Sequence, residues 1–189
     1  MNFTLAPFGA LQVTAQDIEN GNSSKGLAGS LCDGQGKWQL RARSDNPIEV
    51  MSLIRTSNGF LTNLSRTTPS TDGASDVFFM NPGSNTSKRS FLRRVNESDQ
   101  RADITISGID DLGANAPGGD IELSLDARAA TVITAGDLED GNAELGLVGA
   151  LGDGSGKWRL NITADTEIRV QSLLETDTGF LTNLSQPIE

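Results

Sequence analysis

An internal repeat with an offset of 120 residues is the feature that most constrains what this chain can fold into. Residues 11–65 (the first copy) align without a gap with residues 131–185 (the second copy), and roughly half of the aligned positions are identical. The stretch "GLAGSLCDGQGKWQL" becomes "GLVGALGDGSGKWRL", which places Trp38 opposite Trp158 (158 − 38 = 120). A match of this length predicts that the two copies encode the same structural unit.

The repeated stretch is only part of a unit, because residues 77–117 precede the second copy and the sequence contains that stretch once. We call the repeated stretch the back half and residues 77–117 the front half, so the order is back, front, back. We expect residues 1–65 to be a back half, 66–76 a linker of small polar residues, and 77–186 a complete unit. The first copy keeps apolar residues that predict a surface in need of a partner: Trp38, Leu40, Ile48, Val50, Phe60 and Leu64.

The hydrophobic periodicity is that of β-strands. Ile104 and Ile106 alternate with polar neighbours, and Trp158, Leu160 and Ile162 do the same. Glycine-bearing turns separate such runs, which predicts an all-β fold of Ig-like antiparallel β-sandwich repeats. "TSNGF" and "TDTGF" predict hairpins. "TAQDIENG" and "TAGDLEDG" each combine a capping box with a glycine stop, so we expect one short helical turn per repeat.

Several stretches together resemble a known kind of repeat. They are "FFMNPGSNTSKRSFLRRVNES", "ITISGIDDLG", "TAGDLEDGN", "GALGDGSGKWRL" and "VQSLLETDTGFLTNLS". They are similar to β-sandwich repeats found in tandem on secreted and cell-surface proteins of marine and other Gram-negative bacteria, often as appendages to enzymes. The resemblance covers nearly the whole chain, implies an extracellular or cell-surface location, and brings no catalytic residues. It differs in order, because units of that kind run front then back.

Composition argues against catalysis and against two classes of partner. The chain has no histidine, which is the usual general base and the commonest transition-metal ligand. A single cysteine excludes an internal disulfide or a four-cysteine zinc site. A net charge of −10 argues against nucleic acid. We find no apolar run long enough for a membrane span and no signal peptide at the N-terminus, and we expect no enzyme.

Calcium is the one cofactor for which the sequence offers candidates. Asp137, Asp140 and Asn142 surround a turn and carry the oxygen atoms that calcium prefers. Acidic residues in the first turn of a helix are equally explained by the helix dipole, so both interpretations stay open.

The segment "KRSFLRR" is the one basic cluster, with Lys88, Arg89, Arg93 and Arg94. One interpretation is a docking patch for an acidic surface, such as the back half of another copy. The other is solvated charge that blocks stray pairing at a strand edge.

The repeated D-G-x-G-K-W turn predicts that two glycines bend the chain and that Trp38 or Trp158 then begins an inward-facing strand. Cys32 stands where the second copy has Gly152, and it is either a tolerated thiol or a residue that pairs between chains.

We therefore expect a non-catalytic extracellular module that serves as a spacer or self-associating repeat. The alternative is a ligand-binding module for surface glycans or calcium. The expected partners are other copies of the chain or neighbouring repeats of a parent protein. The first copy could take its front half from this chain, from a neighbouring chain, or from an upstream segment.

Overall fold

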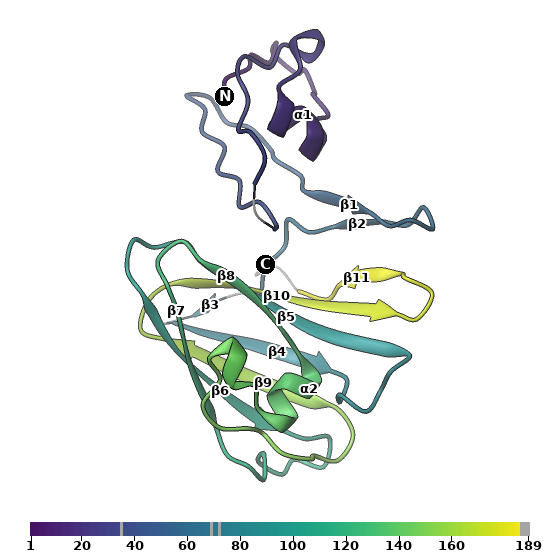
Figure 1. The fold of residues 1–189 in the computed structure, drawn as a ribbon, viewed down its shortest axis with the longest axis vertical. Helices are drawn as coiled ribbons and strands as arrows, with labels where there is room; N and C mark the ends of the chain where they lie inside the picture. Colours follow the sequence, from purple (N-terminus) through teal and green to yellow (C-terminus); the bar gives the residue numbers. More distant parts are fainter. Residues whose placement is uncertain (35, 69, 72, 186–189) are drawn as a thin grey trace. The chain divides into compact units, whose positions relative to one another are not determined.

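The computed structural model describes residues 1–34, 36–68, 70–71 and 73–185, and it divides into two compact units (Figure 1). Unit 1 is Met1–Ile48 and unit 2 is Glu49–Glu189. The first copy is therefore shared between the units, and each unit is described by itself.

Unit 2 contains a sandwich of two antiparallel sheets. In one sheet the order is β3 (Ser70–Thr71), β4 (Ala74–Met80), β9 (Trp158–Ala164), β6 (Ala102–Ile109) and β7 (Ile121–Leu125). In the other sheet the order is β11 (Leu181–Asn183), β10 (Ile168–Thr176), β5 (Lys88–Asn96) and β8 (Ala130–Thr134). The all-β sandwich predicted from the sequence is confirmed.

The core of unit 2 follows the period of two that the sequence shows. Ile104, Ile106 and Trp158 are buried in the first sheet, and Leu92 and Val170 are buried in the second. β5, β6 and β9 alternate buried and more exposed residues, whereas β10 has four consecutive buried residues from Val170 to Leu173. No helix in the described part of the chain is long and apolar enough to cross a membrane.

One short helix forms in each copy, as predicted. They are α1 (Ala15–Asn20) and α2 (Ala135–Asp140), and the 3₁₀ turns η1 (Ser23–Lys25) and η2 (Ala143–Leu145) follow them. The N–H of Asp137 donates to the hydroxyl of Thr134 (3.1 Å), and the Asp137 carboxylate accepts from the Thr134 N–H (2.9 Å). Thr14 and Asp17 form the same capping box in the first copy.

A hairpin also forms in each copy. In the first copy it joins β1 (Leu53–Arg55) to β2 (Leu61–Asn63), and in the second it joins β10 to β11. The N–H of Thr56 donates to the carbonyl of Phe60 (2.9 Å), and Thr176 and Phe180 form the equivalent bond at the same length. The predicted hairpins are confirmed.

The structure extends the repeat to residue 1. Asn2 forms an antiparallel bridge with Ala28, and Glu122 forms the equivalent bridge with Val148. Phe8 has a left-handed backbone with φ 59°, and the residue 120 positions later, Arg128, has φ 61°. The first copy is therefore residues 1–65 and the second 121–185, so that Met1–Leu5 corresponds to β7.

The two copies differ wherever a strand pairs with the front half. β8 pairs with β5, and β9 pairs with β4 and β6. The equivalent residues 10–14 and 38–44, all of them described, form no strand. The expectation that Trp38 begins a strand is therefore wrong, because the described residues of unit 1 provide no strand with which this segment could pair.

The expected domain boundaries stay a prediction. Within the predicted linker, residues 66–76, the structure places β3 and the first residues of β4.

Candidate interaction site

The D-G-x-G-K-W loop of the second copy is held by two carboxylates at the end of β6. Asp110 Oδ2 accepts from the N–H of Ser155 (3.0 Å), and Asp111 Oδ2 accepts from the N–H of Lys157 (2.9 Å). Backbone N–H donors, first Ala114 and then Ser155, lower the pKa of Asp110. The sequence does not reveal that these two acids dock the repeated loop, because the pairing joins residues about 45 positions apart.

The Trp158 side chain is hydrogen-bonded to an acidic side chain, and the backbone approaches it closely at two glycines. Its Nε1 donates to Glu139 Oε1 (2.7 Å). A Cβ added at Gly154 would lie 2.5 Å from the indole, and one at Gly108 of β6 would lie 3.1 Å from the indole Cε3. Glycine is therefore needed in the loop, whereas a side chain at Gly108 would require the indole to shift by a few tenths of an ångström. Only the loop glycine lies within the repeated motif.

The first copy reproduces the contacts of the tryptophan with the helix and with the loop glycine. Trp38 Nε1 donates to Glu19 Oε1 at the same 2.7 Å, and a Cβ added at Gly34 would lie 2.6 Å from the Trp38 indole. The loop, the tryptophan and the helix are thus positioned by the back half alone.

The apolar face around Trp38 is exposed where its counterpart is buried. Phe3 is 45% exposed and Leu123 5%, while Leu40 is 58% exposed and Leu160 2%. Met1, Leu5 and Leu31 differ from their counterparts Ile121, Leu125 and Leu151 in the same way. The residues predicted to need a partner are divided between the units. Trp38, Leu40 and Ile48 lie in unit 1, whereas Val50, Phe60 and Leu64 lie in unit 2. Unit 1 thus exposes an apolar face that includes only part of the predicted set.

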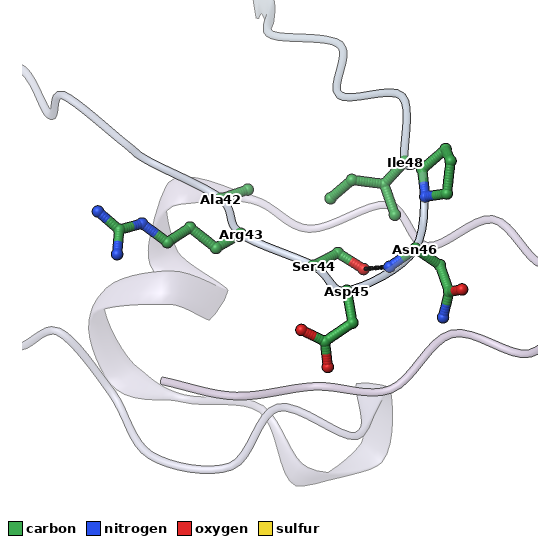
Figure 2. A pocket seen from close by; sticks show the side chains of 7 residues that line it. Ala42, Arg43, Ser44, Asp45, Asn46 and Ile48 are labelled. Atoms are coloured by element: carbon green, nitrogen blue, oxygen red, sulfur yellow. Dashed lines mark hydrogen bonds between the residues drawn. The ribbon is translucent and has the colours of Figure 1, made fainter.

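A shallow hollow lies in the loop that follows this face. Residues Ala42–Ile48 line it, and their side chains point in different directions (Figure 2). The N–H of Asn46 donates to Ser44 Oγ (3.3 Å). In the second copy the residue equivalent to Asp45 is Asp165, which accepts from the N–H of Asp103 at the start of β6 (2.8 Å).

Cys32 is exposed and stands at a position where the second copy needs glycine. It has a left-handed backbone with φ 59°, and Gly152 has φ 73°. A Cβ at Gly152 would lie 3.2 Å from Cγ of Pro117, in the loop between β6 and β7. A side chain at this position therefore crowds that loop when the loop is in place. The two interpretations of the thiol stay open.

The two hairpins lie against each other within unit 2. The Thr62 hydroxyl donates to the carbonyl of Leu181, and Asn183 Nδ2 donates to the carbonyl of Asn63 (3.1 Å). The rings of Phe60 and Phe180 meet edge to face at 4.7 Å. Equivalent positions of the two copies thus lie side by side along the hairpins.

The oxygens proposed for calcium are engaged in local hydrogen bonds. Asp137 Oδ2 accepts from Thr134, and its Oδ1 accepts from Asn142 Nδ2 (2.7 Å). Asn142 Oδ1 accepts from the backbone of η2, and Asp140 is exposed. Burial raises the pKa of Asp137, but the hydrogen bonds from Asn142 and Thr134 outweigh burial and lower it.

Among the residues that the structure describes, no group of three or more acidic, histidine or cysteine side chains could hold a metal ion. A calcium ion here would have to replace the capping bonds, and the calcium site stays a prediction.

The four basic residues of β5 do not form one patch. Lys88 and Arg89 are exposed, Arg93 is half-buried, and Arg94 is 0% exposed. Arg94 does not belong to a surface patch, because strand alternation turns it inward with Leu92. Its guanidinium has no hydrogen-bond partner within the described ranges, and burial lowers its pKa to about 10. The alternation of Leu92 and Arg94 was a signal that could have predicted this. A docking role for the other three stays a prediction.

No family model matches the chain, and no curated protein matches it either. Among solved structures, one similar fold is the Anabaena sensory rhodopsin transducer, with a TM-score of 0.40 and 17% identity. The match covers 57% of this chain and 95% of that one.

Proposed function

We propose that the chain is a non-catalytic structural module of an extracellular or cell-surface protein, in which one copy of the repeat lies directly against the next. The observation that carries this proposal is the contact between equivalent hairpins of the two copies. The resemblance to tandem β-sandwich repeats of bacterial surface proteins supports the location.

The contact joins one face of the first hairpin to the opposite face of the equivalent second hairpin. Thr62 and Asn63 are neighbours in β2, so their side chains point to opposite faces. Thr62 donates to the second hairpin, and it is Asn183, the equivalent of Asn63, that donates back. The Thr62 face of one hairpin therefore lies on the Asn183 face of the other. Such a heterologous contact suits repeats that follow one another in a row.

A matched pair of variants tests the hairpin contact. Asn63 Oδ1 and Asn183 Oδ1 each accept from the serine two residues on, so Asn63→Ala and Asn183→Ala lose the same local bond. Only Asn183→Ala also loses the donor to the carbonyls of Asn63 and Arg66. We expect Asn183→Ala to accelerate amide exchange in β1 and β2 more than Asn63→Ala does. Equal effects would contradict the proposed role of the contact.

Ligand binding is the alternative outcome, and thermal melts separate it from a structural role. A structural module should melt at the same temperature with and without calcium and should not be retained on polysaccharide columns. A rise of many degrees with calcium, or retention on a polysaccharide, would favour the ligand-binding module.

A further inference from the structure

The first copy contains the equivalents of the two strands that flank β6, but it contains no equivalent of β6 itself. In unit 2, β6 lies between β7 and β9 and pairs with both. In unit 1, residues 1–5 and 38–44 are the equivalents of β7 and β9. We propose that these two segments form a docking site for an additional strand of the β6 type, supplied by a segment other than this chain's own 102–109. The inference rests on the proposed structural role and names the partner of one repeat.

The two segments are anchored as their counterparts are. Asn2 and Ala28 exchange backbone hydrogen bonds of 3.0 and 2.8 Å, and Glu122 and Val148 exchange bonds of 2.9 and 2.8 Å. Trp38 is tied to Glu19 as Trp158 is tied to Glu139. The segment 1–5 is thus tied to Ala28, which follows η1, and Trp38 is tied to Glu19 in α1.

The register in unit 2 indicates which residues the added strand would meet. Ile106 pairs with Ile121 on one side and with Ile162 on the other, and Gly108 pairs with Leu160. The equivalent residues in unit 1 are Met1, Ala42 and Leu40, which are all exposed. Covering this face would remove apolar surface from water, which is the main driving force for association.

The same comparison defines the chemistry of the partner. It needs alternating apolar residues, and glycine fits best where it meets the Trp38 indole, because a Cβ at Gly108 would lie only 3.1 Å from the Trp158 indole. A backbone N–H at its start would meet Asp45, the equivalent of Asp165. A carboxylate after its end would meet the N–H of Lys37, the equivalent of Lys157. Recognition is therefore strand addition with side-chain anchors at both ends.

A second copy of this chain is a poor source of the strand. Ile104 and Ile106 of β6 are 2% and 0% exposed in their own sandwich. A chain that gave its β6 to a neighbouring chain would expose the core of its own second copy. Such an exchange would cover one apolar surface and expose another. A side chain at the position of Cys32 would also crowd the loop that carries Pro117, because a Cβ added at Gly152 would lie 3.2 Å from the proline Cγ. The partner is a β6-type strand whose following loop accommodates the thiol.

The test places a second copy of residues 102–120 directly before Met1 of the full chain, which reproduces the natural spacing between β6 and β7. The first fusion carries Cys32→Gly to make room for the loop. We expect amide exchange of residues 1–5 and 38–44 to slow by roughly a hundredfold, while residues 158–164 stay unchanged as an internal reference. A matched fusion with Gly108→Val in the added segment should show no such protection. A third fusion that retains Cys32 should be protected less than the first.

Three outcomes would overturn the inference. The first is equal exchange in the glycine and valine fusions. The second is loss of protection at residues 158–164, which would show that the added strand enters unit 2. The third is protection of residues 38–44 in the unfused chain that grows with protein concentration, which would identify a second copy as the occupant. None of these outcomes bears on the hairpin contact, so the proposed function is tested separately.

Discussion

The two copies of the repeat show which parts of a β-sandwich a sequence forms by itself. Both copies form the capped helix, the 3₁₀ turn, the hairpin and the hydrogen bond from tryptophan to glutamate. Only the second copy forms β8 and β9, which pair with strands of the front half. The shared elements are closed by bonds within about 20 residues. The others depend on partners from elsewhere in the chain.

The difference is energetic as well as geometric. Burying a leucine-sized side chain stabilises a fold by about 1.5–3 kcal/mol. Leu160 receives that stabilisation and Leu40 does not, although both follow the same motif. Identical residues therefore have different consequences in the two copies, and paired substitutions measure the difference.

The largest contrast should come from the two tryptophans. Trp158→Ala removes a side chain that is 1% exposed and should lower the free energy of unfolding by about 3–5 kcal/mol. Trp38→Ala removes a half-buried ring and should cost less than about 1 kcal/mol. Urea unfolding followed by far-ultraviolet circular dichroism measures both. Equal losses would mean that the first copy is covered in solution.

The next effect concerns the front half, whose strand β5 covers the second copy and contains a buried charge. Arg94→Met should raise the free energy of unfolding by about 1–4 kcal/mol, because it replaces a buried charge without a partner in the described structure. Arg93→Met, at a half-buried neighbour, is the control and should change little.

The pH dependence of Arg94 provides a second measurement. Since burial lowers its pKa to about 10, the folded state carries the cost of the charge below that pH and sheds it above. The unfolding free energy of the parent chain should gain a rising contribution above pH 10 that Arg94→Met lacks. The same alkaline profile in both chains would contradict the assignment.

Helix capping should give a smaller contrast. Thr134→Ala removes the N-cap of α2 and should lower the global free energy of unfolding by about 1 kcal/mol. Thr14→Ala removes the equivalent cap of α1, and we expect its effect to be confined to faster amide exchange in Ala15–Asn20. A global loss of the same size in both variants would show that unit 1 and unit 2 unfold together.

The smallest expected effect is on acid stability. The Lys25 ammonium, followed by the hydrogen bonds of Thr14 and Asn22, holds the pKa of Asp17 well below its usual range. Because the folded pKa is lowered, the stabilisation is present above the ordinary aspartate pKa and is lost as pH falls below it. The protection of the α1 amides, measured relative to the intrinsic exchange rate at each pH, should therefore fall on acidification, and Asp17→Asn should remove this pH dependence of the protection. An unchanged profile in Asp17→Asn would exclude this carboxylate as the cause.

Much of the fold could be predicted from the sequence because its signals are local. The alternation of Ile104 and Ile106 identified a half-buried strand, and Thr134 with Asp137 identified a capped helix. The correspondence of Met1–Leu5 to β7 was missed because little more than the alternation survives there. The docking of the repeated loop on Asp110 and Asp111 could not be foreseen, since it depends on strand order.

If repeats follow one another in a row as proposed, the contact between the hairpins would give that row a direction. One hairpin presents the face that carries Thr62, and the other presents the opposite face, which carries Asn183. The two ends of a row built this way are chemically distinct, so whatever terminates one end cannot terminate the other. The asparagine amide and the threonine hydroxyl would then determine at which end the row grows, is anchored or is capped.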